Sequence, residues 1–380
     1  MSTKELWRLY LARTNPRPLC GFLWEPDVKT VRSIVERVGI GNQLKPEDIL
    51  VEDLWAHVEE VLELNSGWSS DFPQAISACL GVPWLEAMIG CPIMVGQDTI
   101  WAEPSARDYD HLLELRIEPD NRWLKRLFVL HKELARLADQ HFFPVCLPLM
   151  RGPLDLLSAI RGPAQLCLDL YDRPRQVKEA VGRLSQLWLK IARLLMEITP
   201  SFADGWFTRM NLFMEGRAAT LQADATSLFS AQIYQEFGLC FDQEIISNIP
   251  GQTYHTHSTS AHILPLISRL PNLRSLQITL DPNGPPKDEL KPILEDCQQR
   301  VPIMLAVWNR DDFCWAVEEF KPGGLAVVLI KTEMKGKEEY EQLLQEVFSL
   351  YKKSIRGSSG SAGTSGVNQF RYLPLKNWYG

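Results

Sequence analysis

The chain has 380 residues, of which 45% are hydrophobic and 23% are charged, and it carries a formal net charge of −7. This is the composition of an ordinary folded protein, and it excludes disorder over most of the length. The small excess of acidic residues, 47 against 40 basic ones, argues against nucleic acid as the main partner.

The amino-terminal segment 1–18 lacks the apolar stretch of a secretory signal. No apolar run along the chain approaches the ~20 residues that cross a bilayer. We therefore expect a cytoplasmic protein without a membrane partner.

The first part of the chain, to about residue 140, is predicted to be mainly helical. Apolar residues recur at helical spacing over 27–38, 52–64 and 123–140. Trp24 and Glu25 end a candidate first strand. Several of the twelve tryptophans of the chain fall in this part, which indicates a well-packed elaboration of the fold.

From residue 142 onward, short apolar runs alternate with helical patterns. Strands are predicted at 142–149, 219–225, 252–258, 273–280, 301–307 and 324–330, and helices at 153–160, 174–198, 230–246, 260–270, 287–300, 311–320 and 337–351. Strands that alternate with helices form a parallel sheet. Five or more such units in succession favour a closed barrel, and no glycine-rich GxGxxG motif follows any strand.

The predicted fold class is therefore α/β, a single (β/α)8 TIM barrel with a helical N-terminal elaboration. The barrel spans residues 1–355, and its helical part covers about 1–140. Residues 356–380 read as a Gly/Ser-rich linker, GSSGSAGTSG, followed by an aromatic C-terminal tail.

Active sites of such barrels lie at the carboxyl ends of the strands. His255 and His257 stand one residue apart on the strand predicted at 252–258, so their rings share one face. Such a pair binds one metal ion if a third ligand converges on it. The alternatives are an acid/base or substrate-binding histidine beside a helix-capping one, or two buried structural histidines.

Acids and amides follow the neighbouring strands. Asp224 ends an otherwise apolar strand, where an unpaired charge is costly; it is either a site residue or the partner of Arg151 or Arg217. Gln222 and Gln277 lie on the strands around it. Asp71 is either a helix N-cap or a site residue. Asp155 is interpreted as an acid in the first turn of a helix. Trp24 and Trp308 are expected to line the pocket.

Three segments resemble the uroporphyrinogen decarboxylase superfamily, of which the chain looks like a divergent member. They read RGPLDLLSAIRGPAQLCLDLYDRPRQVKEAV, TLQADATSLFSAQIYQEFGLCFDQEI and TYHTHSTSAHILPLISRLPNLRSLQI. The resemblance runs in order from residue 26 to 351 and implies a single (β/α)8 barrel. It also implies one of two chemistries.

One chemistry is decarboxylation without a cofactor. In this resemblance Asp71 matches the catalytic aspartate that stabilises the cationic intermediate. The arginine-rich motif that binds the substrate carboxylates in the family has no counterpart near residues 19–26, and no histidine follows His262.

The other chemistry is zinc-dependent methyl transfer between a corrinoid protein and a thiol. His255 matches the first zinc ligand of the family, His257 replaces a cysteine ligand, and no cysteine stands at 331–333. Glu333 is the expected third ligand. Zinc held this way is more electropositive than a thiolate-rich site and activates a thiol or an alkoxide.

The leading prediction is methyl transfer between a small methylated substrate or thiol and a corrinoid protein. The alternatives are a cofactor-free decarboxylase of a uroporphyrinogen-like or smaller carboxylate, and a non-catalytic barrel that binds a ligand. Homodimers are common in this superfamily. The predicted site consists of catalytic Asp71, Asp224 and His255, substrate-binding Trp24, Gln222, His257, Gln277 and Trp308, and metal-binding His255, His257 and Glu333.

Overall fold

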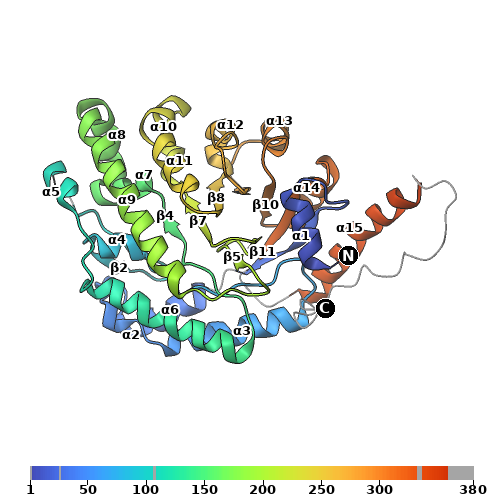
Figure 1. The fold of residues 1–380 in the computed structure, drawn as a ribbon, viewed down its shortest axis with the longest axis horizontal. Coiled ribbons are helices and arrows are strands. Elements are labelled where there is room, and N and C mark those ends of the chain that lie inside the picture. The colour runs from blue at the N-terminus through green and yellow to red at the C-terminus, as the bar shows by residue number, and fades with distance from the viewer. Residues whose placement is uncertain (1, 25–26, 106–107, 332–335, 358–380) are drawn as a thin grey trace.

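The structure is a computed structural model that describes residues 2–24, 27–105, 108–331 and 336–357. A parallel sheet of seven strands stands at its centre, with helices outside it (Figure 1). The α/β class predicted from the sequence is therefore confirmed. None of the described helices is both long and apolar enough to cross a membrane.

The strands of the central sheet pair in the order β1, β11, β10, β9, β8, β7, β4. Every pair is parallel. In the same order their bounds are Leu19–Trp24, Leu325–Lys331, Ile303–Val307, Ser275–Thr279, Gly251–His257, Ala218–Gln222 and Met150–Arg151. Consecutive βα units thus add one strand after another to the sheet, as the sequence pattern predicts.

The two edge strands approach a common segment, residues 71–76. The Asp71 N–H donates to the Cys20 carbonyl of β1 over 3.0 Å. On the other side, Ile76 forms an isolated parallel bridge to Val145. The predicted strand 142–149 is thus represented by this bridge and a second one at Cys146, ahead of the short β4.

The helices largely follow the predicted pattern. Their bounds are α1 Thr3–Leu11, α2 Asp27–Val38, α3 Glu52–Gly67, α4 Trp84–Met88, α5 Tyr109–Glu114, α6 Arg122–His141, α7 Pro153–Arg161, α8 Pro163–Asp172, α9 Pro174–Ile198, α10 Ala231–Phe237, α11 Leu239–Ser247, α12 Leu264–Ile267, α13 Lys287–Gln298, α14 Arg310–Glu319 and α15 Lys337–Gly357, with 3₁₀ turns at Pro46–Asp48, Ala225–Leu228 and Ser258–Ile263. The helix predicted at 230–246 divides at Gly238 into α10 and α11. Small antiparallel pairs, β2 (Ile93–Val95) with β3 (Ile100–Ala102) and β5 (Trp206–Phe207) with β6 (Phe213–Met214), complete the fold.

Two apolar cores lie on the two faces of the sheet. The larger one packs the outward side chains against the helices. The smaller one gathers inward side chains of β1, β10 and β11, including Leu23, Met304 and Val328, together with Trp7 of α1 and Phe213 of β6. Helix α1 and the β5–β6 pair therefore fill the interior from the amino-terminal end of the strands.

The inward positions of β7, β8 and β9 are polar instead. They carry Thr220 and Gln222, then Thr253, His255 and His257, then Ser275, Gln277 and Thr279. All but His257 are buried. One half of the interior is thus a packed apolar core and the other half is hydrogen-bonded, which is the half that carries the candidate site.

The structure corrects the roles predicted for two site residues, Trp24 and Asp71. Trp24 lies on the helix-facing side of β1 with Phe22, because side chains alternate along a strand and Leu23 takes the inward face. Asp71 lies by the start of β1, where Arg17 donates to both of its carboxylate oxygens (2.5 and 2.8 Å). Neither side chain is brought to the histidines.

Two features predicted from the sequence lie partly or wholly outside the described residues. Glu333 is not among them. Of the predicted linker and tail at 356–380, only residues 356 and 357 are described, and they belong to α15.

The junction of β4 with β7 has no room for a side chain at Gly152. The Gly152 N–H donates to the Gln222 carbonyl over 2.8 Å, and a Cβ at Gly152 would lie 2.4 Å from that oxygen. We expect Gly152→Ala to lower the free energy of unfolding by about 1–3 kcal/mol because backbone must shift, measured by denaturant titration. Gly67→Ala, with 3.6 Å to the nearest side-chain atom, is the control; equal stability of the two variants would contradict this packing.

Candidate metal centre

Polar side chains of three adjacent parallel strands meet at the carboxyl-terminal part of the sheet. Gln222 of β7 is in register with His255 of β8, and His255 with Gln277 of β9. His257 lies two residues beyond His255 on the same face, and Asp224 follows β7 directly. The structure therefore brings together five of the residues predicted from the sequence.

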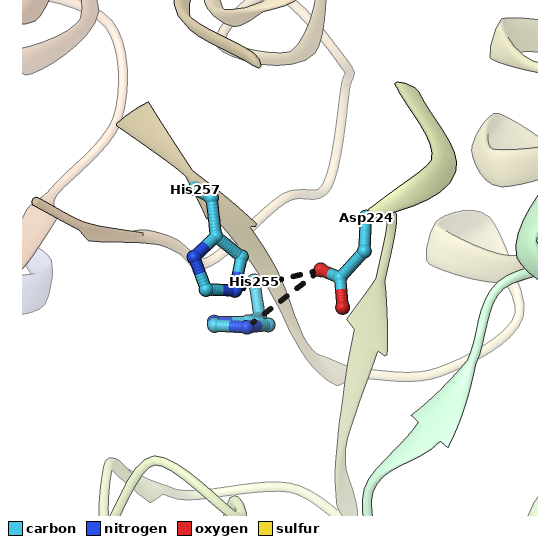
Figure 2. A group of neighbouring side chains, drawn as sticks. All are labelled: Asp224, His255 and His257. Carbon is cyan, nitrogen blue, oxygen red and sulfur yellow. Dashed lines mark ion pairs between the residues drawn. The ribbon is translucent and has the colours of Figure 1, made fainter. Parts of the chain in front are cut away.

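Asp224, His255 and His257 form the centre of this group (Figure 2). Asp224 Oδ1 lies 3.7 Å from His257 Nε2 and 4.0 Å from His255 Nε2. One ligand atom from each of the three residues falls within 4.8 Å of the others. The sequence-based alternative in which Asp224 pairs with Arg151 is not observed, since the Arg151 guanidinium lies 3.3 Å from Glu86.

The position of the proton on His255 follows from its neighbour. His255 Nδ1 contacts Gln277 Oε1, while the amide nitrogen of Gln277 donates to Thr279 Oγ1 over 3.1 Å. The amide oxygen can only accept, so Nδ1 carries the proton. The Nε2 atom of the neutral ring then presents its lone pair to Asp224.

His257 is held in the same tautomer by a carboxylate. Its Nδ1 lies 2.8 Å from Asp281 Oδ1. Asp281 is itself fixed by Ser258, whose Oγ accepts the Asp281 N–H over 2.9 Å and donates to Oδ2 over 3.3 Å. A carboxylate that accepts from the outer nitrogen orients the ring and raises the basicity of the inner one.

Asp224 points one oxygen at the histidines. Its Oδ2 accepts from Gln222 Nε2. Its Oδ1 is buried and has no hydrogen-bond partner among the described residues. A buried carboxylate oxygen without a partner is costly, so this atom is the polar atom of the group that would gain most from binding a cation.

The turn that carries Asp224 rests on a buried acid that the sequence analysis placed only in a helix first turn. Asp155 accepts the N–H groups of Asp224 (3.0 Å) and Ala225 (2.8 Å). Burial, and then the charge of Asp224, raise the pKa of Asp155 well above its usual range. The sequence held one signal for this role, because Asp155 is an acid that lies one turn after Gly152-Pro153, at the end of a predicted strand.

Burial lowers the pKa of His255, and the charge of Asp224 partly opposes this effect. The ring is therefore neutral at neutral pH and keeps its lone pair available. The Nε2 atoms of two imidazoles and one carboxylate oxygen converge here, a donor set that fits a divalent cation. Two histidines with one carboxylate form a known catalytic zinc set that leaves a fourth position open.

Trp308 lies away from this group. It is 46% exposed and lines a groove at the ends of β10 and β11 with Leu329 and Lys331.

Asp281, which the sequence places just after β9, orients His257 in the structure. This role depends on the contact between the two side chains, which the position of Asp281 in the sequence does not reveal.

No protein-family model matches this chain, and no curated protein matches its sequence. Among solved structures it is similar to a "methyltransferase from Methanosarcina mazei", with a TM-score of 0.61, over 91% of this chain and 98% of that chain, at 15% sequence identity. At this identity the likeness shows a shared fold along nearly the entire length of both chains.

The role of Asp281 can be tested by replacing it with an amide. In Asp281→Asn, the amide NH₂ can donate to His257 Nδ1 and favour the tautomer protonated on Nε2, which cannot bind a metal. We expect zinc affinity to fall about 10–100-fold in competition with a chromophoric chelator. Nitrogen-15 spectra of the histidine rings report the tautomer directly.

Asp288→Asn, on the exposed first turn of α13, is the matched control and should bind zinc as the unaltered protein does. Unchanged affinity in Asp281→Asn would show that Asp281 does not orient the ring.

Proposed function

We propose that this protein is a zinc-dependent enzyme of the uroporphyrinogen decarboxylase superfamily that transfers a methyl group between a small methylated substrate or thiol and a corrinoid protein. The observation that carries the proposal is the convergence of three unshared electron pairs, on Asp224 Oδ1 and on the Nε2 atoms of His255 and His257. The fold shared with a methyltransferase and the motif resemblance support the choice of reaction.

In this proposal Asp224 takes the place that the sequence analysis gave to Glu333. The two histidines lie on β8, and Asp224 lies on the turn that follows the neighbouring strand β7, where Asp155 accepts its backbone N–H. A loop residue could add a further ligand, but the described residues already supply three.

Zinc bound to two imidazoles and one carboxylate acts as a Lewis acid that lowers the pKa of a thiol or alcohol. The chain supplies the surroundings for this chemistry. Gln277 and Asp281 hold the rings, Gln222 and Asp155 hold Asp224, and Thr220 and Thr253, joined over 3.1 Å, close the polar interior beneath the group.

We also propose that the sheet closes into the eight-stranded barrel of the superfamily through residues 71–76. The Asp71 N–H of this segment donates to β1. Ile76 donates its N–H to the Pro144 carbonyl over 2.9 Å and accepts the Cys146 N–H over 3.0 Å, which forms the bridge to Val145. In addition, the Gln74 amide donates to the Phe22 carbonyl over 3.0 Å and accepts the Trp24 N–H over 3.0 Å. The Gln74 side chain thus replaces some of the backbone hydrogen bonds that a neighbouring strand would make with β1.

Decarboxylation centred on Asp71 receives no support from the geometry. Both of its carboxylate oxygens accept from Arg17, and Oδ2 also accepts the Cys20 N–H over 2.8 Å. The group is buried beside the amino-terminal end of β1, whereas the polar interior opens at the opposite ends of the strands. These contacts describe a structural ion pair.

Elemental analysis tests the metal site. The purified protein should contain near-stoichiometric zinc, and His255→Ala/His257→Ala should contain none, because only one of the three ligands remains. His262→Ala is the matched control, since His262 Nε2 contacts the Phe229 carbonyl away from the group. Zinc retained in the double variant, or absent from the unaltered protein after zinc is supplied, would refute the site.

Methyl transfer is tested separately with methylcobalamin as donor and small thiols as acceptors, followed by the change in corrinoid absorbance. We expect turnover by the zinc-loaded protein and a loss of more than roughly 100-fold in the double variant, given that outer residues alone change activity about 10–100-fold. Zinc binding without turnover on any thiol would favour the non-catalytic barrel, and carbon dioxide release from porphyrinogens would favour the decarboxylase.

A further inference from the structure

A groove lies between α6 and the carboxyl-terminal half of α9. Figure 1 shows these two helices in the layer outside the sheet. The groove has a volume of about 590 Å³. It is lined by apolar side chains of both helices, among them Leu124, Phe128, Val129 and Leu194. Val129 is 48% exposed, so the apolar lining reaches the molecular surface.

The third wall of the groove is the connection between α5 and α6, and it is held in place by hydrogen bonds. Lys190 of α9 donates to the Ile117 carbonyl over 2.7 Å, and Arg183 of α9 donates to the Leu115 carbonyl over 2.8 Å. Ile117 is buried and forms part of the lining with Pro119. The groove is therefore a built feature of three packed segments.

The charged residues of the lining are all basic. They are Lys125 and Lys132 of α6 and Lys190 of α9. Arg122 and Arg136 of α6 form ion pairs with Glu47 and Glu133, respectively. A chain of net charge −7 thus places an apolar trough and three ammonium groups in one place.

We propose that this groove binds a free anionic amphiphile, a medium- to long-chain carboxylate whose chain lies on the apolar floor and whose head group meets the lysines. The volume lies within the range of small-molecule sites, about 300–1,000 Å³. Charge complementarity selects the anion. A second copy of the chain is a poorer occupant, because a two-fold contact sets the same patch, and its lysines, against itself. This inference is independent of the metal centre.

Calorimetric titration below the aggregation concentration of each probe tests the proposal. Dodecanoate should bind at one site, with affinity rising about threefold to fourfold per added methylene from octanoate upward. Dodecan-1-ol should bind more weakly, and dodecyltrimethylammonium should not compete. Equal binding of the cationic and anionic probes, or no dodecanoate binding, would overturn the proposal.

Variants localise the site. Lys125→Glu/Lys132→Glu should weaken dodecanoate binding up to about fivefold for each lysine lost, and further through repulsion; Val129→Glu should weaken it as well. The controls are Lys321→Glu, an exposed lysine elsewhere, and Leu168→Glu, an apolar residue 58% exposed on α8. Both should bind as the unaltered protein does.

Thermal melts show whether each variant is folded, and His255→Ala/His257→Ala should keep full dodecanoate affinity. Loss of binding in the controls as well as in the groove variants would place the amphiphile elsewhere. A dimer in solution that Val129→Glu converts to a monomer would show that a second copy occupies the groove and would overturn the proposal.

Discussion

Parallel pairing of β7, β8 and β9 is the constraint on which the candidate metal centre depends, since it sends the carboxyl ends of three strands to one edge of the sheet. Register then aligns Gln222, His255 and Gln277 side by side. The two histidines are consequently held by the backbone hydrogen bonds of β8, and Asp224, in the turn after β7, is held by Gln222 and Asp155. Side chains supported in this way keep their positions independently of a ligand.

This constraint has a cost, because it places polar side chains on a face of the sheet that is otherwise packed with apolar residues. The cost is offset by hydrogen bonds that satisfy almost every member of the group, from Thr220 with Thr253 to His257 with Asp281. The exception is Asp224 Oδ1. Polar groups left unsatisfied in an otherwise saturated network point to the place where a ligand completes it.

In the half of the sheet away from the candidate metal centre, the inward face is an apolar core. There β10, β11 and β1 turn Met304, Val328 and Leu23 inward, and α1 packs Trp7 and Tyr10 against them. Asp71 belongs to this half. Its contacts with Arg17 and with the Cys20 N–H hold the segment before β1 to the segment 71–76. The acid that the sequence predicted to be catalytic therefore stabilises the edge of the sheet instead.

The sequence by itself determined the order of βα units, the long helices α6 and α9, and the two histidines on one strand face, because these depend on local periodicity and on residue type. It also pointed to Asp224, Gln222 and Gln277, because strand ends in a parallel sheet share an edge. Tertiary structure decided the rest. The direction in which the Trp24 side chain points depends on the phase of the alternation along β1. The hydrogen-bond partners of Asp71 lie 51 to 64 residues away in the chain, those of Asp155 lie 69 to 70 residues away, and those of Asp281 lie 23 to 24 residues away. Contacts at such separations are set by packing of the whole chain, which no local pattern encodes.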